Sequence, residues 1–180
     1  MHIARLKPAD ALAYRALMLQ AYALAADAFT STAEERALEP EAYWVHRIGA
    51  GDEDDADGAG NLALGAWEAG ALVGTVAVEF SIKPKTRHQA LVIGMYVAPG
   101  CRRGGVGRAL LAQAVAAATA RPGVRAVSLT VTEGNEPALS LYRSAGFQPW
   151  GVEPMAILTP GGFKAKVHMW LPVAEAGPVV

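Results

Sequence analysis

Hydrophobic and polar residues change their spacing several times along the chain, and each change predicts a new element. Residues 2–7 alternate as in a short strand, and a helical pattern follows from Asp10. The predicted apolar face of this helix consists of Leu12, Leu17, Leu19 and Leu24. A second helical piece is expected to start at Ser31 or Thr32, with glutamates at capping distance, and a third spans 40–48.

From residue 61 hydrophobic and polar residues alternate with a period of two, which predicts strands. Residues 61–68 and 71–82 read as a β-hairpin around an Ala-Gly turn, and 88–97 as a third strand. The remaining predicted elements are a helix over 106–120, a strand over 124–132, a helix over 135–145 and strands over 147–153 and 164–171. Strands and helices alternate without an internal repeat, so the order predicts an α/β (α+β) fold with a mixed sheet and helices on both faces.

Composition narrows the classes of protein that the chain can be. Its 180 residues are 52% hydrophobic and 18% charged, which excludes a wholly disordered chain and fits one domain, expected over 1–172 with a frayed tail at 173–180. Sixteen Lys and Arg against seventeen Asp and Glu give no global basic field, so we expect no nucleic-acid partner.

The single cysteine and the first predicted helix indicate where in the cell the protein is expected. The only cysteine, Cys101, cannot form an intrachain disulfide or a Cys-based metal site, so a cytoplasmic location and no metal are expected. Asp10, Arg15 and Gln20 interrupt the Ala- and Leu-rich start, which is too polar for a secretion signal or a membrane span. An amphipathic helix and no membrane partner are predicted.

The most informative stretch is a glycine- and arginine-rich loop between a strand and a helix, at 100–107. Free backbone N–H groups and the positive end of the helix dipole meet there, and such a site favours a phosphate. Gly100 and Gly105 have the Walker spacing, but Val106-Gly107 replaces the required Lys-Ser/Thr, so a P-loop NTPase is excluded. A Rossmann fingerprint is also weak, since its third glycine is missing.

Two motifs carry a resemblance to a known family. Arg102, Gly105 and Gly107 meet the pattern Arg/Gln-x-x-Gly-x-Gly/Ala, and residues 135–147 read Asn-x-x-Ala-x-x-x-Tyr-x-x-x-Gly-Phe. In this order and at this distance, they resemble the GCN5-related N-acetyltransferase (GNAT) superfamily, over about residues 61–171. The resemblance implies a mixed sheet of six or seven strands, splayed between the fourth and fifth, and an acetyl-CoA cosubstrate without a metal.

The resemblance also assigns roles to individual residues. The residues that it places against acetyl-CoA are Met95, Tyr96, Val97, Arg102, Arg103, Gly104, Gly105, Val106, Gly107, Arg108, Asn135 and Tyr142. Tyr142 matches the tyrosine that acts as general acid toward the departing thiolate, and a phenol is protonated at neutral pH. The fourth strand lacks the carboxylate that often serves as base, so Glu79 is the first candidate and His88 the next.

The acceptor stays open at this stage. Glu153 and His168 could line its side of the cleft, and the acidic run 52–57 would suit a cationic amine such as a polyamine or aminoglycoside if it is not an inert loop. Small amino acids and protein N-termini or lysines are further options, and a homodimer is left open. The predicted function is direct acetyl transfer to a primary amine in a ternary complex. The alternative is a non-catalytic acyl-CoA sensor or complex subunit.

Overall fold

A single seven-stranded mixed sheet organises the molecule, as the computed structural model shows; it describes residues 1–49 and 60–173. The strand order is β1-β2-β3-β4-β5-β7-β6. The strands are β1 His2–Arg5, β2 Leu62–Glu68, β3 Ala71–Phe80, β4 Gln89–Val97, β5 Ala126–Thr132, β6 Gln148–Thr159 and β7 Gly162–Pro172. The predicted fold class is confirmed. The acidic run 52–57 and residues 174–180 of the predicted tail lie outside the described residues.

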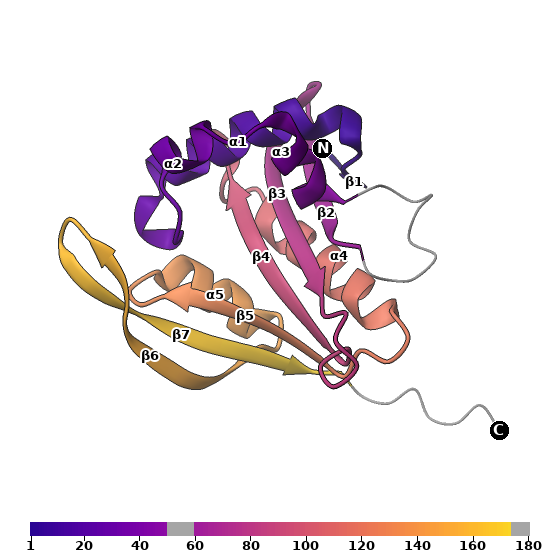
Figure 1. Ribbon diagram of the computed structural model, residues 1–180, viewed down its shortest axis with the longest axis vertical. Coiled ribbons are helices and arrows are strands. Elements are labelled where there is room, and N and C mark those ends of the chain that lie inside the picture. Colours follow the sequence, from indigo (N-terminus) through magenta and orange to yellow (C-terminus); the bar gives the residue numbers. More distant parts are fainter. Residues whose placement is uncertain (50–59, 174–180) are drawn as a thin grey trace.

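The sheet is splayed at its only parallel pair. β4 pairs with β5 over Gln89–Leu91 alone, opposite Ala126–Ser128, and all other neighbouring strands are antiparallel. Beyond Leu91 the two strands diverge, so the sheet opens into two halves that meet at one end (Figure 1). The predicted splay between the fourth and fifth strands is therefore confirmed.

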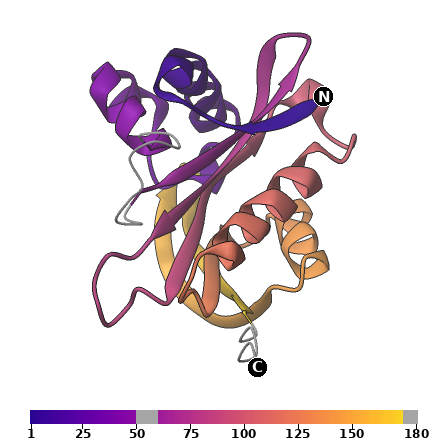
Figure 2. The same cartoon turned by 90° about the vertical axis from the view of Figure 1, so that its right-hand side faces the viewer.

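Helices cover both faces of the sheet (Figure 2). The α-helices are α1 Ala11–Leu24, α2 Ala33–Ala37, α3 Glu41–Ile48, α4 Val106–Ala120 and α5 Glu136–Ser144. The Thr32 hydroxyl accepts a hydrogen bond from the Glu35 amide at 3.1 Å, so the predicted cap of α2 is at Thr32. α1 and α3 pack on one face around Trp44 and Tyr14, and α4 packs on the other around Leu110.

The predicted apolar face of α1 is partly wrong. Leu17 is buried, but Leu12 and Leu24 are 64% and 63% exposed. The buried positions are Ala11, Tyr14, Leu17, Met18, Ala21 and Tyr22. The helix carries alanines on all of its faces, so the positions of its leucines do not show which face is buried. The large side chains of Tyr14, Met18 and Tyr22, spaced four residues apart, set the buried face instead.

The last hairpin is longer than predicted. A strand was predicted over 147–153, yet β6 continues through Pro154 to Thr159. β6 is an edge strand, where a proline leaves no ladder bond unmade, and the register shifts between Glu153 and Ile157, with Met155 at a φ of 53°. The proline therefore marks a bulge rather than a strand end.

Candidate active site

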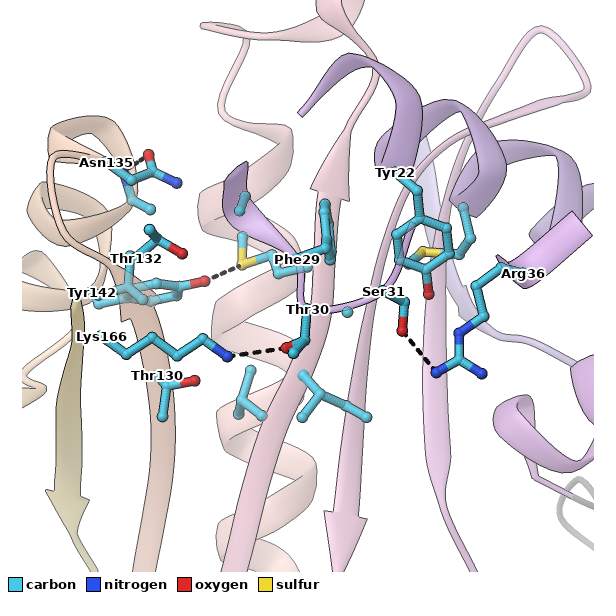
Figure 3. Close-up of a pocket in the computed structure, with 18 of the residues that line it drawn as sticks. Tyr22, Phe29, Thr30, Ser31, Arg36, Thr130, Thr132, Asn135, Tyr142 and Lys166 are labelled. Atoms are coloured by element: carbon cyan, nitrogen blue, oxygen red, sulfur yellow. Dashed lines mark hydrogen bonds between the residues drawn. The ribbon is translucent and has the colours of Figure 1, made fainter. Parts of the chain in front are cut away.

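A cavity of about 340 Å³ lies on the open side of the splay, between the two halves of the sheet. Its wall combines β4, β5 and β7 with α1, α2, α3, α5 and the segment 28–31. Figure 3 shows side chains from both halves facing one another across this space: Thr130, Thr132, Asn135, Tyr142 and Lys166 on one side, and Tyr22, Phe29, Thr30, Ser31 and Arg36 nearer the helices.

A bulge in β4 shapes the floor of the cavity. Thr75 pairs with Tyr96 and Ala77 pairs with Ile93, so two residues of β4, Gly94 and Met95, lie opposite one residue of β3. Gly94 has a φ of 60°, a conformation that favours glycine. Beyond Leu91 the edge of β4 toward β5 has no partner strand, because β5 diverges from it. Of the strand end predicted to contact the cosubstrate, Met95 lines the cavity, whereas Tyr96 and Val97 are not on its wall.

The arginine-rich loop forms an anion site at the start of α4. Arg103 and Gly105 both have positive φ values, 66° and 81°, which curl the loop so that successive amides point to one side. No acidic residue and no side-chain cap occupies the first turn of this 15-residue helix, so its N-terminal amides are available to a ligand. Arg103 and Arg108 are exposed around them.

Arg102 has a different role from its neighbours in the loop. Its Nε donates to the carbonyl oxygen of Val97 at 2.8 Å, and its guanidinium lies 5.5 Å from the ring centroid of Tyr96. It therefore fastens the loop to the end of β4. A Cβ on Gly107 would lie 3.4 Å from the Met95 methyl, so the glycine lets the loop approach the bulge closely.

Tyr142 on α5 closes the cavity opposite the bulge. Its side chain is only 8% exposed, and its hydroxyl donates to the sulfur of Met95 at 3.6 Å (Figure 3). Burial raises the pKa of Tyr142 to about 12, because the apolar surroundings disfavour the phenolate. The hydroxyl is therefore a proton donor throughout the neutral range, held next to the predicted strand end.

Asn135 borders the same space from the start of α5. Its side-chain oxygen accepts a hydrogen bond from the Ala138 amide at 3.3 Å, which caps the helix. The capping bond fixes the side chain against the cavity wall and positions α5, with Tyr142 two turns along.

Neither candidate base lies on the cavity wall. Glu79 is half-buried on β3, opposite Leu91, on the sheet face that α1 and α3 cover. It lies close enough to Tyr14 to contribute to the raised pKa of that hydroxyl, behind the larger effect of burial. His88 is exposed at the closed end of the splay, where its carbonyl accepts from the amides of Arg125 and Ala126.

Three other residues singled out from the sequence lie elsewhere. Glu153 and His168 form a pair at 3.0 Å on β6 and β7, away from the wall of this cavity. Cys101 donates to Glu68 at 3.4 Å, and desolvation together with the Glu68 carboxylate raises the pKa of the thiol. A thiol held in its protonated form is a poor nucleophile.

Sequence analysis missed the arginines on the helical side of the cavity. Arg36 and Arg47 both line it, and their guanidiniums lie 5.0 and 5.8 Å from the ring centroid of Tyr43. Arg36 is held by Ser31 at 2.7 Å and Glu39 at 3.1 Å. The one local signal is the spacing of four between Tyr43 and Arg47, which puts them on one helix face. Trp44, the residue between them on α3, is fully buried in the core.

Within residues 1–49 and 60–173, no group of three or more His, Cys, Asp or Glu side chains is arranged to hold a metal ion. Among the helices of the same residues, none is both long and apolar enough to cross a bilayer.

Comparisons with known proteins agree with this geometry. A sequence model of the acetyltransferase (GNAT) family matches residues 18–147. A GNAT-family acetyltransferase structure from Streptococcus pneumoniae is 23% identical, with a TM-score of 0.76 over 96% of this chain and 99% of that chain. A ribosomal-protein-alanine N-acetyltransferase from Brucella melitensis is 25% identical, with a TM-score of 0.74 over the same shares.

A further solved structure contains the cosubstrate. This GNAT superfamily phosphinothricin acetyltransferase from Sinorhizobium meliloti, in complex with AcCoA, is 21% identical, with a TM-score of 0.79 over 98% of this chain and 90% of that chain. Among curated proteins, none matches the chain in sequence.

Proposed function

The chain belongs to the acetyltransferase (GNAT) family, and from this premise we propose that it transfers an acetyl group from acetyl-CoA to a primary amine by direct attack in a ternary complex. The observation that carries the proposal is a cavity bordered by both the β4 bulge and the α5 tyrosine, with Gly107 of α4 packed beside Met95 of the bulge. A cytoplasmic location belongs to the proposal and rests on the single cysteine.

The residues present fit the cosubstrate. The amides of 103–108 and the start of α4 suit a pyrophosphate, with Arg103 and Arg108 as exposed counter-charges. The backbone of Met95, Tyr96 and Val97 would hold the pantetheine arm along the opened edge of β4, as an added strand does. Asn135 would flank the arm from α5.

Tyr142 and the β4 backbone would divide the chemistry between them. As the amine nitrogen forms its bond to the thioester carbon, N–H groups of the bulged strand would stabilise the oxyanion. When the C–S bond breaks, the Tyr142 hydroxyl would give its proton to the leaving sulfur and recover one from solvent. The amine loses one proton in the same cycle, so charge and atoms balance.

Arg103 and Arg108 should strengthen acetyl-CoA binding through their charge rather than by shaping the loop. We expect the double variant Arg103→Gln/Arg108→Gln to weaken acetyl-CoA binding about five- to tenfold at low salt, and less at high salt, because exposed charges are screened. Calorimetric titration at two ionic strengths measures this. Arg87→Gln, an exposed arginine before β4, is the control and should change nothing. A loss that does not depend on salt would contradict the electrostatic role.

We propose Glu79 as the base, acting through water, because it faces the same side of the sheet as Tyr14 at the cavity corner. Glu79→Gln should then lower kcat/KM about tenfold at pH 7, with the deficit shrinking at high pH as the amine loses its proton unaided. A pH profile of kcat/KM measures this, with Glu153→Gln as the control outside the cavity. An unchanged profile would contradict this role.

The absence of a carboxylate from the cavity wall, in the part of the chain described, is the observation that favours the alternative of a non-catalytic acyl-CoA sensor. The two functions separate in one experiment. Calorimetry with acetyl-CoA tests binding, and thiol release across a panel of amines tests transfer. Binding without transfer to any amine would favour the sensor, and no binding would overturn both.

A further inference from the structure

Two polar side chains meet beside the β4 bulge: Arg47, which lines the cavity, and Tyr14, which is buried next to it. The position of a Cβ on Gly94 lies 3.8 Å from both Arg47 Nη2 and Tyr14 Oη, so the glycine leaves the space in front of them open. Tyr14 is 0% exposed, and its hydroxyl interacts with the Arg47 guanidinium but has no partner at full hydrogen-bond geometry among the described residues. Arg47 Nε is buried and equally without a partner. Buried polar atoms of this kind are rare unless a ligand or water completes them.

The charge of Arg47 also lacks a counterpart. Within residues 1–49 and 60–173, the ion pairs within 4.0 Å do not include Arg47, whereas Arg36 is paired with Glu39. Burial opposes the charge of Arg47, but the hydroxyls of Tyr14, Tyr22 and Tyr43 outweigh it and raise the pKa of the guanidinium. Arg47 is therefore a half-buried cation that donates to the Tyr43 hydroxyl at 3.4 Å and has no carboxylate within 4.0 Å among the described residues.

The rest of the wall suits an anion rather than a cation. No Asp or Glu is among the described residues that line the cavity, and Lys166, on the far side, donates to the Thr30 hydroxyl at 3.0 Å (Figure 3). A polyamine or aminoglycoside would enter a field of its own sign. A carboxylate would accept from the Arg47 guanidinium and from the Tyr14 hydroxyl together.

The short separation along β4 between the Arg47 corner and Tyr142 limits how far the acceptor's amine can lie from its carboxylate. Gly94, at the Arg47 corner, precedes Met95, whose sulfur accepts from the Tyr142 hydroxyl. A carboxylate at this corner and an amine at the reacting centre are therefore about one residue apart. The cavity of about 340 Å³ is at the small end of the roughly 300–1,000 Å³ typical of small-molecule sites, so it fits a small acceptor.

We infer that the acetyl acceptor is a free amino acid or a close analogue, whose carboxylate is bound by Arg47 and Tyr14 at the β4 bulge. The inference rests on the proposed function and names its acceptor class. Arg47 and Tyr14 bind the acceptor, and they take no part in proton transfer to sulfur.

The experiment compares amines that differ only in the carboxylate: methionine with methioninamide and 3-(methylthio)propylamine, and phenylalanine with phenylalaninamide and 2-phenylethylamine. Thiol release from acetyl-CoA gives kcat/KM, and calorimetric titration of the CoA complex gives binding without turnover. We expect the acids to exceed their amides and amines at least tenfold in both readouts, with spermidine inactive.

Variants assign the preference to the corner. Arg47→Gln should erase the advantage of the acids over the amides through KM, and Arg47→Lys should keep part of it. Tyr14→Phe removes the hydroxyl and keeps the ring that packs on Trp44, so the protein should stay folded while KM for the acids rises about threefold to tenfold. Arg87→Gln is the exposed control.

The outcomes separate the two proposals. Amides that bind as well as acids, or an acid preference that survives Arg47→Gln in a folded protein, would overturn the inference, while transfer to the amides would leave the acetyltransferase intact. Acids that bind through Arg47 without thiol release would support the inference as acceptor binding and would count against the proposed catalysis.

Discussion

Replacing Tyr142 by phenylalanine is expected to lower kcat about 100-fold while leaving the affinity for acetyl-CoA nearly unchanged. General acid catalysis contributes about 10²–10⁴ in rate. In the protein without substrate, the substitution removes only one long hydrogen bond, from the Tyr142 hydroxyl to the Met95 sulfur. The ring still packs against Phe147, with centroids 6.1 Å apart, so α5 keeps its place. Thiol-release kinetics and calorimetry measure the two quantities.

The pH dependence makes the test sharper. Since burial raises the pKa of Tyr142 to about 12, the hydroxyl stays protonated well above neutrality, and kcat should show no alkaline decline from this group below about pH 10. Ser140→Ala, an exposed change on the same helix, is the matched control. A Tyr142→Phe enzyme that keeps kcat within threefold would remove the tyrosine from the acid role.

The cosubstrate side could be predicted because its constraints are local. Gly105 begins α4 in a left-handed conformation and Asn135 caps α5 through its own side chain, so each motif fixes backbone geometry within a few residues. The apolar stripe of α4, with Leu110, Leu111 and Ala114 buried, follows from the helical period alone.

The acceptor side could not be predicted, because no local pattern determines it. Arg47 becomes a cavity residue only when α3 packs beside Tyr14 of α1 on the sheet, and both helices precede the motifs. The bulge at Gly94 is equally invisible to a period-two pattern, since one extra residue in β4 shows only against its partner β3. A carboxylate base was sought on the fourth strand, whereas the described cavity wall offers arginines.

Replacing Trp44 by alanine is expected to be the most damaging single change to stability, at about 3–5 kcal/mol, because the indole is fully buried between α1 and the sheet. Its ring meets Tyr14 and Tyr43 edge-on, with centroids 6.0 and 5.2 Å apart. For a domain of this size the loss corresponds to a fall of about 10 °C in Tm, measured by calorimetry or circular dichroism.

The comparison variant is Trp150→Ala, which removes an indole that is 65% exposed and should change Tm by about 2 °C or less. Trp44 supports both Tyr14 and the helix that carries Arg47, whereas the loop proposed to bind acetyl-CoA precedes α4, which packs in the opposite core. A folded Trp44→Phe protein should therefore show a larger rise in KM for the acceptor than for acetyl-CoA. Equal effects on both substrates would mean that the two cores do not support the two binding sites separately.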